Sequence, residues 1–299
     1  MSSGTKDYFG YSGKTCVITG AASGVGRALA DMLMEAGADV WAVDMKPVTG
    51  VSHSVIADLR FTEQIDAAAA QLPEHIDCLF SNAALPGVIY QGKDYTELEV
   101  FTVNYLSARY IIELLAERMK EGSTITVTAS ITGEGWKDKI ELLEDLYGCA
   151  DIPSAIAWAK EHFDDPGTFD GGRTPQPLYV FTKECLIYYV KRSAFKMLKR
   201  GIRINCLSPG AIDTPMTEDF GKLLVQFKQF EYMEEYAHAA VGPAVDRSAT
   251  AHETAMCLFW LGSEMTRVLS GADLAADFGF QAAYETGICT AGGLLIKEE

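Results

Sequence analysis

Long apolar runs are missing from this sequence of 299 residues. No stretch approaches the roughly 18 consecutive apolar residues that a membrane-spanning helix requires. The first segment, Met1–Tyr11, is polar and has no apolar centre of the kind found in secretory signal peptides. We therefore expect a cytoplasmic protein that has no membrane partner.

Positive charge is scarce as well. Lysine and arginine number 25 against 41 aspartates and glutamates, which gives a formal net charge of −16. Such an acidic surface repels phosphate backbones and anionic lipid heads, so we expect no nucleic-acid partner. Solubility explains the charge, and any anionic ligand must be held by a local site.

Paired cysteine motifs are also absent. The seven cysteines are odd in number, and no C-x-x-C occurs. Most lie in apolar segments such as Thr15–Thr19 and Ile202–Leu207. This usage favours free buried thiols in a reducing compartment over a disulfide framework or a metal site.

The hydrophobic pattern alternates short β-branched runs with longer helical stretches. This rhythm predicts an α/β fold, a doubly wound parallel sheet of about seven strands with helices on both faces. The strands are expected at Thr15–Thr19, Asp39–Val43, His53–Ala57, Ile76–Ser81, Thr124–Ala129, Arg203–Ser208 and Asp273–Ala276. The helices are expected at Gly26–Ala36, Thr62–Gln71, Val100–Met119, Leu178–Lys199 and Ala249–Ser263.

No repeat or linker divides the chain, so residues 1–299 are expected to form a single domain. Its core would span about 14–279, followed by a tail over 280–299. Two segments are longer than ordinary connections. Residues 133–177 form an insertion with helical pieces at Lys139–Leu146 and Pro153–His162, and residues 215–243 are expected to form a helical substrate lid.

A glycine-rich turn, T-G-A-A-S-G-V-G-R, follows the first strand at Thr19–Arg27. Glycines there let the backbone approach a pyrophosphate, which the helix N-terminus then attracts. The spacing differs from the G-x-G-x-x-G fingerprint, and a plain glycine turn is the alternative interpretation. The pattern favours a Rossmann-type dinucleotide site.

Asp44 supports that interpretation. It ends the second strand about twenty residues beyond the glycines, where a carboxylate binds the ribose hydroxyls of NAD. The same charge repels the 2′-phosphate of NADP, although Lys46 could soften the discrimination. We expect NAD(H) as the coenzyme.

Tyr179 and Lys183 place a phenol and an ammonium on one face of a predicted helix. A phenol is a poor base at neutral pH unless a nearby positive charge favours its phenolate. Such a pair can exchange a proton with an alcohol or a ketone. Chance also supplies this spacing readily, so its meaning depends on the surrounding motifs.

Taken together, these motifs resemble the short-chain dehydrogenase/reductase family, and the resemblance runs from about Lys14 to Gly279. The motifs come in order at successive strand ends. They are Thr19–Gly26, Asp58, Asn82-Ala83, Asn104, Ser130, the Tyr179–Lys183 pair, Pro209-Gly210 and Thr214.

The resemblance implies an NAD(H)-dependent oxidoreductase that interconverts a secondary alcohol and a ketone. Ser130 would bind the substrate oxygen, and Lys183 would bind the nicotinamide ribose and assist Tyr179. Asn104 would hold a water for proton exchange; a core asparagine there, and a turn-capping serine at Ser130, are the alternatives. The implied coenzyme contacts are Gly20, Ser23, Gly24, Val25, Gly26, Asp44, Asp58, Leu59, Asn82, Ala83, Tyr179, Lys183, Pro209, Gly210, Ile212 and Thr214.

The chain departs from the family pattern in three places. The family's N-N-A-G is S-N-A-A at Ser81–Ala84, and its D-G-G is D-F-G at Asp277–Gly279. The gap from Ser130 to Tyr179 is also longer than usual. None of these changes removes a proton-transferring residue, so we expect activity.

The long insertion resembles that of the bacterial 3α-hydroxysteroid dehydrogenase/carbonyl reductase branch, which implies a steroid or bile-acid substrate. Its apolar stripe could contact substrate, the core or another subunit, whereas the lid is expected to contact substrate. The alternatives are a dehydrogenase of other bulky or aromatic secondary alcohols and a non-catalytic NAD-binding sensor or scaffold. We expect a homodimer or homotetramer. The stripe is Ala155, Ile156, Trp158 and Ala159, and the lid's apolar residues are Met216, Phe220, Leu223, Leu224, Phe227, Phe230 and Met233.

Overall fold

A parallel sheet of seven strands, ordered β11-β8-β7-β4-β1-β2-β3, forms the centre of the fold. The structure is a computed structural model and describes residues 7–87, 89–162, 177–226, 245 and 247–289. All neighbours in this sheet pair in parallel, which confirms the predicted fold class. Its strands are β1 (Thr15–Thr19), β2 (Asp39–Asp44), β3 (His53–Ile56), β4 (Ile76–Ser81), β7 (Met119–Thr128), β8 (Arg203–Pro209) and β11 (Asp273–Ala276).

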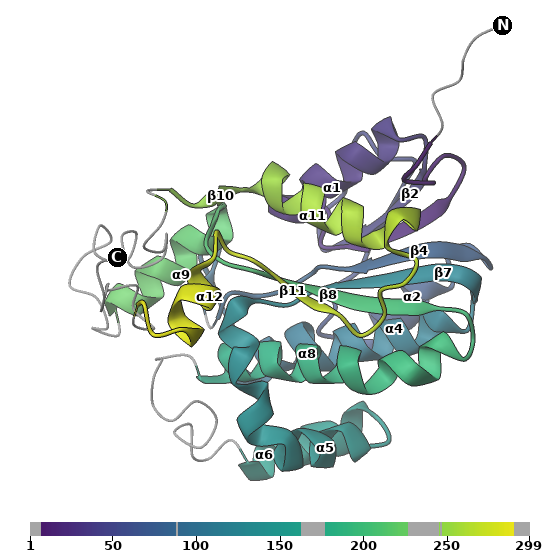
Figure 1. The fold of residues 1–299 in the computed structure, drawn as a ribbon. Coiled ribbons are helices and arrows are strands. Elements are labelled where there is room, and N and C mark those ends of the chain that lie inside the picture. Colours follow the sequence, from purple (N-terminus) through teal and green to yellow (C-terminus); the bar gives the residue numbers. More distant parts are fainter. Residues whose placement is uncertain (1–6, 88, 163–176, 227–244, 246, 290–299) are drawn as a thin grey trace, which may run out of the picture.

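Helices cover both faces of the sheet because successive strand side chains point to opposite sides. In β1, Cys16 and Ile18 belong to one buried apolar cluster and Val17 to the other. Figure 1 shows α1 and α11 on one face and α2, α4 and α8 on the other. These helices are α1 (Gly24–Glu35), α2 (Thr62–Ala69), α4 (Ala108–Ala116), α8 (Pro177–Leu198) and α11 (Ala251–Gly262).

The long helix predicted at Val100–Met119 is wrong in its last turn. Instead, α3 (Glu97–Phe101), a π-helix (Thr102–Ser107) and α4 follow one another, and α4 ends at Ala116. Met119 already belongs to β7, where it pairs with Ile76. Apolar residues continue at helical spacing past the end of α4, so periodicity alone could not locate the change.

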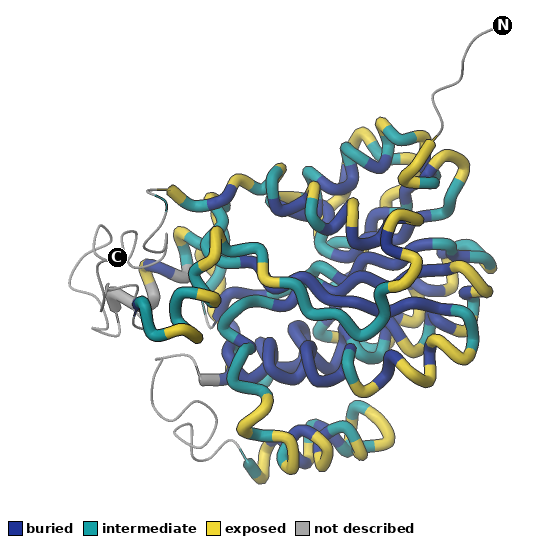
Figure 2. The backbone as a smooth tube through the Cα atoms, in the orientation of Figure 1, coloured by how far each residue is buried: buried dark blue, intermediate teal, exposed yellow. Residues whose placement is uncertain are grey.

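The described part of the predicted insertion, up to His162, is helical. It consists of a 3-10 helix (Ile131–Lys139), α5 (Ile140–Gly148) and α6 (Ile152–His162), and it packs on the outer side of α8 (Figure 1). Its outward side is exposed, whereas the central strands are buried (Figure 2). The last part of the predicted insertion, residues 163–176, lies outside the described residues.

Several small elements lie outside the main sheet, and of these only the helical start of the lid was expected from the sequence. Helix α9 (Pro215–Gln226) begins the predicted lid, and α12 (Phe280–Glu285) lies in the predicted tail. A short antiparallel hairpin joins β5 (Ile89–Tyr90) to β6 (Lys93–Asp94), and β9 (Ile212–Asp213) pairs with β10 (Ala249–Thr250). A 3-10 turn, Glu264–Thr266, follows α11.

All seven cysteines are free, as expected from their number and spacing. Within the described part of the chain, no helix is long and apolar enough to cross a membrane. The described residues also contain no cluster of three or more His, Cys, Asp or Glu side chains that could hold a metal ion.

Candidate active site

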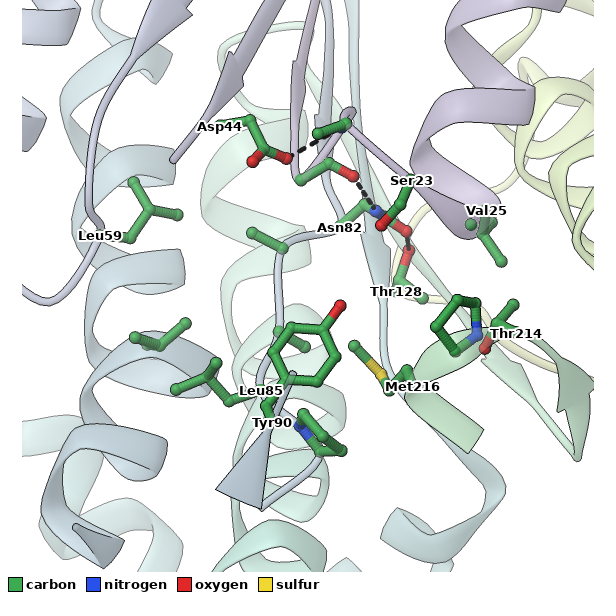
Figure 3. A pocket seen from close by; sticks show the side chains of 18 of the residues that line it. Ser23, Val25, Asp44, Leu59, Asn82, Leu85, Tyr90, Thr128, Thr214 and Met216 are labelled. Carbon is green, nitrogen blue, oxygen red and sulfur yellow. Dashed lines mark hydrogen bonds between the residues drawn. The ribbon is translucent and has the colours of Figure 1, made fainter. Parts of the chain in front are cut away.

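A cleft opens at the carboxyl ends of β1, β2, β4, β7 and β8, where parallel sheets typically bind ligands. Figure 3 shows that Ser23, Asp44, Asn82 and Met216 surround it. The cleft brings together nearly all of the predicted site residues, and only Gly26 and Asn104 lie outside its lining.

The glycine-rich turn is packed too tightly for side chains. A Cβ at Gly20, whose φ is +73°, would lie 2.7 Å from the Cα of Ala83. A Cβ at Gly26 would lie 2.1 Å from the carbonyl oxygen of Gly20. Gly26 thus shapes the turn from behind the cleft. Ser23, the N-cap of α1, makes no side-chain capping bond, so its hydroxyl and the helix N-terminus face the cleft together.

Asp44 lies beside this turn at the end of β2. Its carboxylate accepts hydrogen bonds from the backbone N–H groups of Ala22 (2.9 Å) and Lys46 (3.1 Å). These bonds fix the carboxylate at the rim of the cleft and leave further lone pairs for a ligand. The ammonium of Lys46 instead donates to Gln91 Oε1 at 2.7 Å.

Asp58 and Leu59 line the next part of the cleft, after β3. The carboxylate of Asp58 forms an ion pair of 2.7 Å with Arg60, which also contacts Glu99 at 2.6 Å. Burial raises the pKa of Asp58, but the hydrogen bonds from Arg60 outweigh it and hold that pKa below its ordinary value. Asp58 therefore stays ionised at neutral pH.

Asn82 connects the ends of three strands. Its side-chain amide donates to Gly20 O at 3.2 Å, and its Oδ1 accepts from the hydroxyl of Thr128 at 3.1 Å. Thr128, which the motifs did not single out, thus joins β7 to the glycine-rich turn. Ala84 stands where the family pattern has a glycine. This residue lines the open cleft, so the added methyl group has space.

Tyr179 and Lys183 lie one turn apart on α8. The ammonium of Lys183 is 5.4 Å from the centre of the Tyr179 ring and donates to Thr128 O at 3.4 Å. Burial lowers the pKa of Lys183 to about 8. Ser130 lines the same cleft, and its Oγ accepts a hydrogen bond from the N–H of Thr132, so its own O–H remains able to donate.

Asn104 is buried outside the cleft lining, in the π-helical segment. Its side chain accepts from Leu85 N at 2.7 Å and donates to Leu85 O at 2.9 Å. The side chain therefore fixes the start of the loop that follows β4. Single π-helical turns are frequent at functional sites, and a part for Asn104 in proton exchange stays a prediction.

Pro209, Gly210, Ile212 and Thr214 line the far wall of the cleft, and their contact with the coenzyme stays a prediction. A Cβ at Gly210 would lie 2.8 Å from the Cβ of Asp277, so the backbone is close-packed there. The neighbouring departure, Phe278, adopts a φ of +56°. This left-handed conformation is strained for an aromatic residue.

Sequence comparison decides the family. The "short chain dehydrogenase" model matches residues 14–139, and the "Enoyl-(Acyl carrier protein) reductase" model matches residues 170–281. Coniferyl-alcohol dehydrogenase of Pseudomonas sp. (strain HR199 / DSM 7063) is 30% identical over 91% of this chain and 98% of its own length. The chain belongs to the short-chain dehydrogenase family. It is therefore an oxidoreductase that acts on alcohols.

Two further proteins are similar to this chain, one in sequence and one in structure. A 2,5-dichloro-2,5-cyclohexadiene-1,4-diol dehydrogenase of Sphingobium indicum is 27% identical, with 91% of this chain and 98% of the relative covered. The NADH complex of a 3-alpha-hydroxysteroid dehydrogenase from Pseudomonas sp. B-0831 superposes with a TM-score of 0.71 at 23% identity, covering 91% and 99% of the two chains. This superposition shows that the two proteins share a fold.

The described helices of the insertion in this short-chain dehydrogenase pack their apolar side against the core. Its predicted apolar stripe is buried at Ala155, Trp158 and Ala159, in the cluster that includes α8, and Ile156 packs against that cluster. Past Lys139 no described residue of the insertion lines the cleft. In the lid, Met216 lines the cleft, whereas the side chains of Phe220, Leu223, Leu224, Phe227, Phe230 and Met233 lie outside the described set.

Sequence reasoning missed the hairpin side of the cleft. Tyr90 and Gln91 of the β5–β6 hairpin line it, together with Leu85, Tyr95 and Val103. A Gln-Gly pair between two short apolar-polar runs was the available signal. It is weaker than the Asn-Gly or Asp-Gly turns that mark most two-residue hairpins.

Proposed function

We propose that the protein is an NAD(H)-dependent dehydrogenase of bulky, ring-bearing alcohols, in which Tyr179 exchanges the proton. One observation carries this proposal. The Tyr179–Lys183 pair and Ser130 line the same cleft as the glycine-rich turn and Asp44. Proton exchange and coenzyme binding would therefore occur side by side.

The coenzyme is NAD(H), and the residues present fit it. The turn at Gly20 and Gly26 leaves no room for a Cβ, which keeps backbone N–H groups accessible to a pyrophosphate. Asp44 presents a carboxylate for the ribose hydroxyls, as in other NAD sites. When bound, the nicotinamide supplies hydride to the substrate carbon or accepts it.

The protein's own residues handle the proton. In the direction of oxidation, Tyr179 takes the proton from the substrate hydroxyl, and in reduction it returns a proton to the carbonyl oxygen. The positive charge of Lys183 favours the phenolate that this exchange requires. Ser130 donates its O–H to the substrate oxygen and stabilises the negative charge that develops there.

The substrate class follows from the apolar part of the cleft and from the relatives. Leu85, Tyr90, Val103 and Met216 line the cleft together with Ser130. An apolar wall beside a few polar groups is typical of sites for ring-bearing ligands. The relative at 30% identity is a coniferyl-alcohol dehydrogenase, which favours an aromatic alcohol.

A hydroxysteroid is the second candidate, because the same apolar wall could hold a steroid ring. The insertion, which first suggested a steroid, does not distinguish the two, since its described part beyond Lys139 packs away from the cleft. The proposal also keeps the expectation of a homodimer or homotetramer, which light scattering would test.

The purified protein should be assayed for NADH formation with four groups of alcohols: aryl and arylpropenyl alcohols, cyclic diols, hydroxysteroids with bile acids, and small polyols. We expect the highest kcat/KM with an aromatic alcohol. Higher efficiency with a steroid or bile acid would select the second candidate. Turnover confined to polyols would contradict the substrate class, and the absence of turnover with all four groups despite NADH binding would favour the sensor alternative.

A further inference from the structure

The β5–β6 hairpin lies at the mouth of the cleft, with its turn at Gln91 and Gly92. Both turn residues have positive φ, +51° for Gln91 and +72° for Gly92. This geometry suits the twist of a two-residue hairpin, but it normally selects Asn, Asp or Gly at both positions. A glutamine in a left-handed conformation is unfavourable and persists only where surrounding contacts hold it.

Gln91 bridges the two rims of the cleft. Its side-chain Oε1 accepts from the Lys46 ammonium at 2.7 Å, and Lys46 follows the coenzyme-binding Asp44 by two residues. The backbone N–H of Gln91 donates to Asp219 Oδ2 at 3.0 Å. Asp219 belongs to α9, and Met216 of the same helix lines the cleft. The turn is thus bonded to the ribose rim and to the lid helix.

The root of the hairpin is fixed separately. The side chain of Asn104 accepts a hydrogen bond from Leu85 N at 2.7 Å and donates one to Leu85 O at 2.9 Å. Leu85, Tyr95, Val100 and Val103 form a small apolar cluster of their own, against which Tyr90 packs. This small cluster is separate from the two large ones that form the main cores.

The tip, in contrast, is held by two exposed polar contacts. Tyr90 and Met216 project into the same space in Figure 3, so the hairpin and α9 lie next to one another beside the cleft. A dinucleotide lying between Asp44 and Tyr179 would pass beneath this tip.

We propose that Gln91 is a latch that retains the coenzyme: its bonds to Lys46 and Asp219 close the hairpin across the cleft and slow coenzyme release. The inference rests on the proposed NAD(H) site. Gln91 is a positioning residue in this account, since it acts through the hairpin and takes no part in hydride or proton transfer.

The test measures the NADH dissociation rate by stopped-flow fluorescence, with no alcohol present. Gln91→Ala removes the side-chain contact with Lys46, and we expect release to be roughly 3- to 10-fold faster, the effect of losing one exposed hydrogen bond to a charged group. In Gln91→Asn the asparagine favours the left-handed turn, but its side chain is too short to reach Lys46. This variant should therefore release NADH as fast as Gln91→Ala does. Gln91→Glu keeps the reach and an acceptor and should restore slow release.

Two further variants test the partners. Lys46→Met should accelerate release as Gln91→Ala does, and the double variant should be no faster than either single one, because both remove the same contact. Asp219→Ala removes the other contact of Gln91 and should accelerate NADH release independently of the Lys46 contact. Asp94→Ala, an exposed position on the same hairpin, is the matched control and should keep the normal rate.

Several results would overturn the latch. Wild-type release rates in Gln91→Ala and Lys46→Met would do so, and so would a normal rate in Gln91→Asn beside a fast one in Gln91→Ala, which would assign the effect to the turn alone. If the wild-type protein binds NADH and these variants release it normally, the latch fails and the proposed function stands. If the wild-type protein does not bind NADH, both fail.

Discussion

The Lys183 ammonium lies 5.4 Å from the centre of the Tyr179 ring, on a side chain that is only 2% exposed. Its one hydrogen bond among the described contacts is to a backbone carbonyl, that of Thr128. A cation buried in this way is costly to keep, and such groups are concentrated at functional sites. The buried cation therefore supports the proposal that this pair takes part in proton exchange.

Replacement of Lys183 by methionine should stabilise the fold. Burial lowers the pKa of Lys183 from 10.5 to about 8, so the protonated lysine opposes folding. Below about pH 8 both folded and unfolded chains hold the proton, and the cost is fully present. We expect Lys183→Met to gain about 1 to 3 kcal/mol there.

The pH dependence of that gain has a definite sign. Between about pH 8 and 10.5 the folded wild-type chain has released a proton that the unfolded chain still binds. Wild-type stability therefore rises across this interval, and the advantage of Lys183→Met shrinks. Urea unfolding of both proteins from pH 6 to 10.5 checks this. A methionine variant that is less stable than wild type at pH 7 would contradict it.

Asp44 should determine the choice between NAD and NADP. Asp44→Asn keeps an acceptor for the N–H of Ala22 but removes the charge that repels a 2′-phosphate. We expect the ratio of kcat/KM for NADP to that for NAD to rise by about tenfold or more. Asp31→Asn, which removes an exposed carboxylate paired with Arg27 on α1, should leave the ratio unchanged. An unaltered ratio in Asp44→Asn would remove Asp44 from coenzyme selection.

Gly26 should tolerate no side chain. In Gly26→Ala the new Cβ would lie 2.1 Å from Gly20 O and 2.6 Å from Asn82 Nδ2, so the turn must deform. We expect a loss of about 2 to 4 kcal/mol in stability together with weaker NADH binding. Gly148→Ala is the matched control, because a Cβ there meets nothing within 4 Å. Thermal unfolding with and without NADH separates the two effects, and a Gly26→Ala protein with the stability and NADH binding of wild type would refute the packing argument.

The strands and most helices could be predicted because their patterns are strong. β1 and β4 are buried on both faces and read as apolar runs. The helix was predicted to end at Met119 but ends at Ala116, because no glycine or proline marks the change from α4 to β7. Strands of two residues, such as β9 and β10, carry no periodicity and depend on partners 37 positions apart.

The candidate site was predictable where its residues stand at strand ends in fixed motifs, as Asp44 and Asn82 do. What Asn104 contacts could not be read from a motif, because its side chain binds the backbone of Leu85, a contact made only in the folded chain. The contacts of Gln91 could not be predicted from the sequence for a related reason. Its partners Lys46 and Asp219 lie 45 and 128 positions away.

Tyr179→Phe is the decisive variant for the proposed proton exchange, because it removes the phenolic oxygen and preserves the ring. Turnover of the best alcohol and NADH affinity should be measured in the same preparation. We predict that turnover falls by roughly a thousandfold, while the NADH dissociation constant stays close to that of wild type. Unchanged turnover in Tyr179→Phe would contradict the central claim that this phenol exchanges the proton.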